Sequence, residues 1–265
     1  MAKPIICFDL DGTLVDEDGR IHPQDIEILR TETRVHFIPA TGRPLRAIRQ
    51  AFERNGMFLN HRIPFPMISQ NGAVLYRPDE NLHTYYPFTP ETQTALLEIA
   101  QHHAHIASQW FTREQIYVLG LNDIVLSMAH RYDLNLQPFN RAPKPSEFIK
   151  VTFMADSTET MQSLNGAASN LRVERVFSIP EILEINAPGV SKGQMLTVLR
   201  AELGWNDAPT FVAGDGETDL SLFEHATIAF CPDTSPTSVK SRADEVINVK
   251  QVGLLTPILE QISRD

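Results

Sequence analysis

The chain opens with an apolar run that ends in two aspartates, within the stretch ICFDLDGTLVDEDG at residues 6–19. The four apolar residues 5–8 are typical of a strand that is buried on both faces of a sheet. Asp9 ends this run, and Asp11 follows in a turn where Gly12 gives the backbone freedom to bend. Two carboxylates held this close repel each other, so their presence indicates a bound cation or a reaction that needs them.

Composition and charge set the class of protein. The 265 residues are 42% hydrophobic and 21% charged, which is enough for a large core divided between two domains. The net charge is −10, and no block of lysine and arginine stands out. We therefore expect neither a nucleic-acid nor a membrane partner.

The cysteines and the start of the chain indicate a cellular compartment. Cys7, in the buried run, and Cys231 are the two cysteines, a pattern that favours reduced thiols over a disulfide framework. The first apolar run stops at Asp9, which is too short for a signal peptide, and no run approaches the length of a membrane span. We expect a soluble cytoplasmic protein, either a monomer or a small homo-oligomer.

Strand and helix signals alternate at both ends of the chain. This alternation predicts a doubly wound, Rossmann-like α/β core with a mostly parallel sheet. The predicted strands of the core lie within residues 4–9, 34–44, 66–76, 208–219, 227–230 and 244–249. The middle of the chain has an α+β pattern instead. We therefore predict a core domain of residues 1–82 and 186–265, interrupted by a smaller α+β cap domain of residues 83–185.

Three details of the middle segment predict its local structure. Thr89 followed by Pro90 is a helix-start signal. The stretch 147–155 alternates like a half-buried strand. The aromatic residues Trp110, Phe111 and Tyr117 could stack on a sugar, but we interpret them as part of the core of the cap.

Four stretches place polar residues just after an apolar run. In a parallel α/β sheet such positions meet at the carboxyl ends of the strands, so we expect a single site there. The four sets are Asp9 with Asp11 and Thr13; Thr41 with Gly42 and Arg43; Lys192; and Asp215 with Asp219.

This set of side chains suits phosphoryl transfer. Asp9, Asp11 and Asp215 offer the hard oxygen ligands that Mg²⁺ prefers. One carboxylate can attack phosphorus to form an aspartyl-phosphate, and Asp11 can protonate the leaving oxygen and later deprotonate water. Thr41 can donate a hydrogen bond to a phosphoryl oxygen, and Lys192 supplies a compact positive charge.

Five motifs in order resemble those of haloacid dehalogenase superfamily phosphatases, above all the Cof-type group that includes sugar phosphatases and sucrose-phosphate phosphatases. They are FDLDGTL at 8–14, ATGRP at 40–44, SQNGA at 69–73, GVSKG at 189–193 and GDGETD at 214–219. The resemblance spans nearly the whole chain and is weakest in the middle. A lone D-x-D would be weak, whereas five ordered motifs at fitting distances are specific.

The resemblance implies a role for each motif residue. Asp9 is the nucleophile and Asp11 the general acid and base, while Mg²⁺ is held by Asp9, the backbone carbonyl of Asp11, and Asp215. Asp219 supports the metal site, so the predicted metal set is Asp9, Asp11, Asp215 and Asp219. The predicted substrate-binding set is Thr41, Gly42, Arg43, Asn71 and Lys192.

The place of the insertion also resembles one branch of this superfamily. Only 29 residues lie between Asp11 and Thr41, and the extra domain falls between Thr41 and Lys192. This implies a type-two α/β cap, which closes over the site, excludes water and contacts the leaving group.

The chain departs from the superfamily pattern at a few positions. Thr218 stands where relatives carry asparagine, and Pro232 and Asp233 replace a common Gly-Asn-Ala segment. Pro39 is unusual inside a strand because proline cannot donate to a sheet ladder. None of these touches the predicted nucleophile or lysine, so we expect activity to survive, with its substrate undefined by the sequence.

Some predicted site residues have simpler interpretations. Thr41 could cap the next helix, Lys192 could be solvated at a helix start, and Asp219 could be a helix-start carboxylate. Arg43 could contact substrate or brace the site. Asn71, like the nearby Ser69, could be a turn residue only.

Three other functions fit part of the pattern. A phosphomutase of the same superfamily would return the phosphoryl group to substrate. A glycosyltransferase could use D-x-D to hold a metal and a nucleotide, but it would not need a strand-end nucleophile. A non-enzymatic aspartyl-phosphate signalling module is much shorter and lacks both the second acid and the cap. A Mg²⁺-dependent phosphatase of a small phosphorylated metabolite, such as a sugar phosphate, fits all the motifs.

Overall fold

The computed structural model describes residues 2–59, 61–103, 106–142 and 147–264. The chain forms two compact units, one of Met1–Thr84 with Ser191–Asp265 and one of Tyr85–Val190. The sequence predicted domain limits at 82/83 and 185/186, close to the limits of these two units. The extent of the functional domains stays a prediction.

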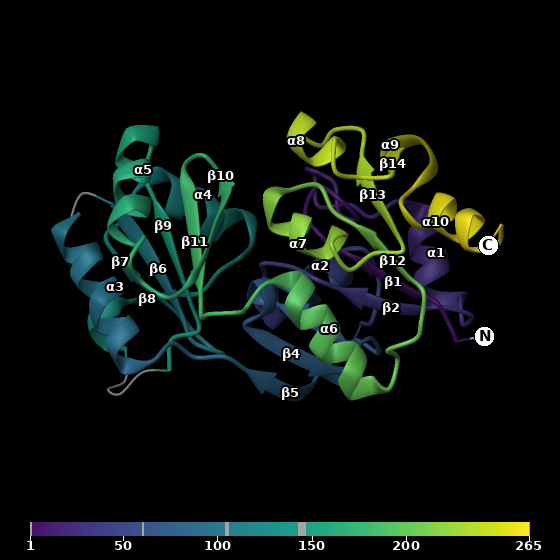
Figure 1. The fold of residues 1–265 in the computed structure, drawn as a ribbon, viewed down its shortest axis with the longest axis horizontal. Helices are drawn as coiled ribbons and strands as arrows, with labels where there is room; N and C mark the ends of the chain where they lie inside the picture. The colour runs from purple at the N-terminus through teal and green to yellow at the C-terminus, as the bar shows by residue number, and fades with distance from the viewer. Residues whose placement is uncertain (1, 60, 104–105, 143–146, 265) are drawn as a thin grey trace. The chain divides into compact units, whose positions relative to one another are not determined.

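The first unit is built on a parallel sheet. Within the described residues it has five strands in the order β14-β13-β12-β1-β2, and each neighbouring pair is parallel. Figure 1 shows the first strand of the chain beside strands from its last quarter. The predicted parallel α/β core is confirmed. The strands are β1 (Ile5–Phe8), β2 (His36–Pro39), β12 (Thr210–Ala213), β13 (Ile228–Pro232) and β14 (Glu245–Ile247).

The helices of this unit lie between its strands and after the last of them in the chain. One of them, α6 (Lys192–Leu203), begins where the Ser191 hydroxyl accepts a hydrogen bond from the Gln194 amide at 3.2 Å. Its first helical residue is therefore Lys192. The others are α1 (Pro23–Thr31), α2 (Leu45–Arg54), η4 (Glu217–Asp219), α7 (Leu220–Phe223), α8 (Thr237–Lys240), α9 (Val249–Val252) and α10 (Leu255–Ile262).

Pro39 is tolerated because of its place in the sheet. It is the last residue of β2, which is the outermost strand, and it pairs with Phe8 of β1. The next residue resumes the ladder, since the Ala40 amide donates to the Phe8 carbonyl at 2.8 Å. An edge strand can lose one donor without leaving a neighbouring strand unpaired.

A small sheet follows in the chain, and Asn71 and Gly72 lie in its first turn. β3 (Met67–Ser69) and β4 (Val74–Arg77) pair in an antiparallel hairpin through η1 (Gln70–Gly72). The chain then passes through η2 (Pro78–Glu80) into β5 (Asn81–Tyr85), the third strand.

The second unit contains a mixed sheet. Its described strands have the order β10-β11-β9-β6-β7-β8, all antiparallel except β7 with β8. The sequence did not predict β8, a three-residue strand that ends in a proline. The strands are β6 (Ala107–Phe111), β7 (Ile116–Leu119), β8 (Leu136–Pro138), β9 (Lys150–Met154), β10 (Glu174–Ile179) and β11 (Ile182–Asn186). The helices are α3 (Pro90–His102), α4 (Asp123–Arg131), η3 (Phe139–Arg141) and α5 (Thr158–Ala167).

Two predictions for this unit are confirmed and one is wrong. Thr89 caps α3 by accepting from the Thr92 amide at 3.2 Å. Trp110 is fully buried and packs edge-on against Phe148, with ring centroids 5.3 Å apart. In contrast, β9 is buried along its whole length rather than half-buried, because it lies between β11 and β6 and its Lys150 is neutralised by an ion pair with Glu184.

None of the helices in the described part of the chain combines the length and the apolar character that crossing a membrane requires.

A buried carboxylate joins the two ends of the first unit. Asp25 on α1 is 1% exposed, and its oxygens accept from the Leu254 and Leu255 amides, each at 2.8 Å. These amides start α10, so the side chain satisfies donors that a helix end leaves unpaired. Gly253 precedes them at a φ of 74°, where a Cβ would come within 2.7 Å of Asp25 Oδ1.

We expect Asp25→Ala to lower the free energy of unfolding by about 2–3 kcal/mol, because two buried amides lose their acceptor. Chemical denaturation measures this loss. Glu27→Ala, an exposed position on the same helix, is the control and should change stability little. Equal losses in the two variants would contradict this role for Asp25.

Candidate functional site

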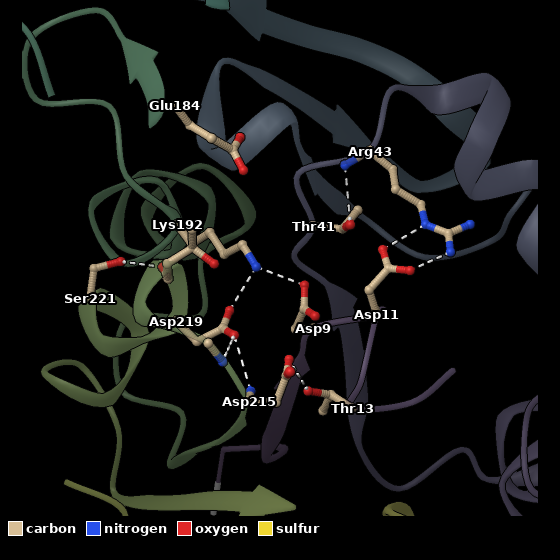
Figure 2. Close-up of polar contacts among 12 residues, drawn as sticks. Asp9, Asp11, Thr13, Thr41, Arg43, Glu184, Lys192, Asp215, Asp219 and Ser221 are labelled. Carbon is tan, nitrogen blue, oxygen red and sulfur yellow. Dashed lines mark hydrogen bonds and ion pairs between the residues drawn. The ribbon is translucent and has the colours of Figure 1, made fainter. Parts of the chain in front are cut away.

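Two of the predicted site residues, Asp9 and Asp215, lie at the carboxyl ends of neighbouring strands, whereas Lys192 is the first residue of a helix. Asp9 directly follows β1, and Asp215 comes two residues after β12. These strands pair in register, with Phe8 opposite Ala213, so the two aspartates are brought to the same edge of the sheet. Figure 2 shows the carboxylates of Asp9 and Asp219 beside the ammonium of Lys192, which enters from the start of α6.

Lys192 holds two of the aspartates. Its Nζ donates to Asp9 Oδ1 at 2.7 Å and to Asp219 Oδ1 at 2.6 Å, and the three side chains are buried. Burial alone would lower the pKa of Lys192, but the two carboxylates outweigh it and hold that pKa above its ordinary value. The lysine is therefore a permanent positive charge at the end of β1.

Three carboxylates gather around this charge. Asp9, Asp215 and Asp219 each offer an oxygen within 4.8 Å of the others. Burial, followed by the negative charge of Asp219, raises the pKa of Asp215 from 3.8 to about 6. The pKa of Asp9 is also raised, chiefly by burial, against the opposing effect of Lys192. One lysine does not neutralise three acids, and this set of hard oxygen donors fits a divalent cation such as Mg²⁺.

Asp219 shapes the loop that carries Asp215. Its Oδ2 accepts from the backbone amides of Asp215 and Gly216, both at 3.1 Å, while its Oδ1 accepts from Lys192. Gly214 is also essential to this loop, because a Cβ there would overlap the Asp219 side chain. Asp219 therefore holds the Asp215 loop and Lys192 in place, and its support of a metal site stays a prediction.

Two further contacts support this site, one from Thr13, which the sequence placed at the strand end without a role, and one from Ser221, which the sequence did not single out. The Thr13 hydroxyl donates to Asp215 Oδ1 at 3.1 Å, and the Ser221 hydroxyl accepts from the Gly193 amide at 3.1 Å. Thr13 was visible as the polar residue next to the two aspartates, whereas Ser221 lies in a helix that carries no motif. Gly193 is required at the contact because a Cβ would overlap the Ser221 backbone.

Asp11 has a different partner from Asp9. Its oxygens accept from Arg43, with Nε to Oδ2 at 2.7 Å and Nη2 to Oδ1 at 2.5 Å. The Asp11 side chain therefore lies with Arg43 and is not in the three-carboxylate group found among the described residues. Its backbone carbonyl remains the predicted metal ligand.

The loop after β2 is held in place by the hairpin that follows it. The Thr41 amide donates to the Ile68 carbonyl at 2.8 Å, and the Asn71 amide donates to the Thr41 carbonyl at 3.0 Å. The Thr41 hydroxyl accepts from the Arg43 amide at 3.2 Å across Gly42. Thr41 and Asn71 are buried, and Asn71 adopts a φ of 58°. The structure thus brings the predicted Thr41–Arg43 loop and Asn71 together.

Comparison with known sequences identifies the protein family that this chain matches. The family model described as haloacid dehalogenase-like hydrolase matches residues 6–253. The pyridoxal phosphate phosphatase of Escherichia coli is 24% identical, with 93% of this chain and 94% of that protein covered. The phosphoglycolate phosphatase of Methanopyrus kandleri is 24% identical, with 97% and 98% covered. A Bacillus subtilis protein named 5-amino-6-(5-phospho-D-ribitylamino)uracil phosphatase is 22% identical, with 91% and 88% covered.

Solved structures have the same fold over the whole chain. A sugar phosphatase of haloacid dehalogenase subclass IIB has a TM-score of 0.82 at 22% identity, with 98% of this chain and 99% of that chain covered. A protein of Thermotoga maritima has a TM-score of 0.80 at 25% identity, with 100% and 99% covered. The α/β core with an inserted α/β cap is therefore the fold of this subclass.

The raised pKa of Asp215 gives a testable pH dependence. Between pH 3.8 and about 6 the folded state holds a proton that the unfolded chain releases. The stability that this proton supplies is present below pH 3.8 and lost as the pH rises through about 6. A cation must displace the same proton at low pH. We expect saturating Mg²⁺ to raise Tm by about 5 °C at pH 7.5 and by less at pH 5.

Differential scanning fluorimetry with and without Mg²⁺ measures this shift. Asp215→Asn should abolish it, and Asp18→Asn, an exposed control in the loop after Asp11, should keep it. An equal shift at both pH values, or a shift that survives in Asp215→Asn, would contradict a metal site at these acids.

Proposed function

Because this chain belongs to the haloacid dehalogenase-like hydrolases and is a phosphatase that acts on small phosphorylated metabolites, we propose that it is a Mg²⁺-dependent sugar-phosphate phosphatase that uses Asp9 as its nucleophile. The observation that carries this proposal is the buried contact between Lys192 Nζ and Asp9 Oδ1. It holds one carboxylate at a strand end, beside a fixed positive charge that can attract a phosphate dianion.

In the first step an oxygen of Asp9 forms a bond to phosphorus. The ester P–O bond breaks, its electron pair goes to the leaving oxygen, and that oxygen takes a proton from Asp11. The Lys192 ammonium and the Thr41 hydroxyl stabilise the negative oxygens of the transferring group. The alcohol is released and Asp9 carries the phosphoryl group.

In the second step water attacks the phosphorus of the aspartyl-phosphate. Asp11 takes a proton from this water, the bond between phosphorus and the Asp9 oxygen breaks, and inorganic phosphate leaves. Asp9 regains its negative charge. Transfer to water rather than back to an alcohol distinguishes this reaction from that of a phosphomutase.

The acids provide the binding site for the metal ion. Asp9, Asp215 and the backbone carbonyl of Asp11 would hold Mg²⁺, with Asp219 keeping the Asp215 loop in place. When bound, Mg²⁺ supplies positive charge that offsets the repulsion between the carboxylates and the phosphate.

The assignment of a sugar phosphate rests on the polar groups of the cap unit and on the range of the relatives. Gln109 of β6 and Thr152 of β9 lie opposite each other and are buried. Within the described residues, the Gln109 amide and the Thr152 hydroxyl have no hydrogen-bond partner. Buried polar groups without partners are rare, so we infer that these two serve the recognition of a hydroxylated group by the cap unit. The relatives named above act on several phosphorylated metabolites, which supports the class of substrate.

Phosphate release from a panel of phosphorylated sugars and other metabolites, with Mg²⁺ and with a chelator, tests the proposed activity. We expect Mg²⁺-dependent release that is greatest for a sugar phosphate. Release from another class of metabolite would overturn the sugar assignment. Release that persists in the chelator would overturn the metal requirement.

We expect Asp9→Asn to reduce kcat at least about 10⁴-fold, because the amide is a poor nucleophile toward phosphorus. Circular dichroism should show an unchanged fold. Asp18→Asn is the matched control and should retain wild-type kcat. Near-native kcat in Asp9→Asn would refute its assignment as the nucleophile.

A further inference from the structure

Asp11 is held by the guanidinium of Arg43, whereas Asp9 is held by the ammonium of Lys192. Both Asp11 oxygens accept from Arg43, at 2.7 Å and 2.5 Å, in the parallel geometry that a guanidinium and a carboxylate share. The Arg43 side chain is 12% exposed and that of Asp11 29% exposed, so the pair is only partly screened by water. Such a bidentate pair fixes the orientation of a carboxylate, which a single bond would leave free to rotate.

Arg43 is itself held by two further parts of the first unit. Its Nη1 donates to the Ala47 carbonyl at 3.1 Å, which ties the guanidinium to the first turn of α2. Its own carbonyl accepts from the Ser69 hydroxyl at 2.7 Å and from the Gln70 amide at 3.2 Å. Hydrogen bonds other than those to Asp11 therefore fix both the backbone and the side chain of Arg43.

The turn that anchors Arg43 has an unfavourable backbone. Gln70, Asn71 and Gly72 have φ values of 52°, 58° and 104°, a run of left-handed residues of which only the last is glycine. Gly72 packs tightly, because a Cβ would come within 2.8 Å of the Ser191 carbonyl oxygen, next to Lys192. Strain of this kind persists where the surrounding structure requires it, and such residues cluster at active sites.

We infer that Arg43 is a positioning residue for Asp11, and that the turn at residues 69–72 holds Arg43 in place for this purpose. The inference rests on the proposed function, in which Asp11 donates a proton to the leaving oxygen and later accepts one from water. A proton donor must be placed within hydrogen-bond distance of the reacting atom. When Asp11 carries the proton on one oxygen, the Arg43 bond to that oxygen gives way, and the bond to the other oxygen keeps the carboxyl group in place. Arg43 then acts through Asp11 and does not bind the phosphoryl group, which chooses between the two interpretations that the sequence left open.

This role predicts a dependence on the leaving group. An ester of 4-nitrophenol loses its alcohol as a stable anion, whereas an ester of the weaker acid 4-methylphenol needs the proton more. We expect Arg43→Met to lower kcat/KM for 4-methylphenyl phosphate about tenfold more than for 4-nitrophenyl phosphate. KM for 4-nitrophenyl phosphate should stay within about threefold of wild type, because binding of the phosphoryl group is unchanged.

Asp11→Asn and the double variant show whether the two residues act together. Asp11→Asn should show the same preference for 4-nitrophenyl phosphate, at least as strongly. Arg43→Met combined with Asp11→Asn should lose no more than Asp11→Asn alone, because a residue that acts through Asp11 has nothing left to position. Arg43→Lys keeps the charge but lacks the two parallel donors, so it should not restore the wild-type ratio.

Two further variants keep the test valid if Arg43→Met does not fold. Ser69→Ala removes the hydroxyl bond to the Arg43 carbonyl and should shift the ratio of the two substrates in the same direction by about threefold. Arg54→Met removes an exposed arginine at the other end of α2 and should leave both rates unchanged. Thermal unfolding of each variant identifies losses that come from misfolding.

The outcomes separate this inference from the proposed function. Equal losses for both substrates, a large rise in KM, or additive losses in the double variant would mean that Arg43 contacts the phosphoryl group, and would overturn the inference alone. If the wild-type protein releases phosphate from neither aryl ester nor from any metabolite of the panel, the proposed function fails and the inference fails with it.

Discussion

The ammonium of Lys192, buried between Asp9 and Asp219, is the interaction on which the site of the first unit depends. A buried carboxylate without a counter-charge is costly, and removing one partner of a buried ion pair typically costs several kcal/mol. The start of α6, the end of β1 and the turn at η4 must therefore meet at one point. Glycines at 193 and 214 permit that approach, because a side chain at either position would overlap its neighbour.

Two cations give the two neighbouring aspartates different environments. Lys192 bonds Asp9 within the buried group of acids, and Arg43 bonds Asp11 in a partly exposed position. The repulsion between adjacent carboxylates is thereby relieved by separate partners on different elements. Identical residue types that are placed in different surroundings can serve as nucleophile and as proton carrier, which is the division of labour that the proposed reaction requires.

The sequence predicts most of the core and part of the site. The apolar runs that end in Asp9 and before Asp215 predict two neighbouring strands of a parallel sheet, and the structure has them. The pattern failed at β9, where polar residues that suggested a solvated face are buried, because Glu184 neutralises Lys150. Periodicity reports the chemical type of each side chain, but it does not report the partner that makes its burial possible.

The sequence by itself determined the order of the motifs, the residue types at the strand ends and the family to which the chain belongs. Only the tertiary structure decided that Arg43 holds Asp11, that Thr13 supports Asp215, and that Ser221 meets the start of α6. The physical reason is distance along the chain. Lys192 and Asp9 are 183 residues apart, and Thr13 and Asp215 are 202 residues apart. Such contacts form only when packing brings the elements together, and no local pattern encodes which atoms then meet.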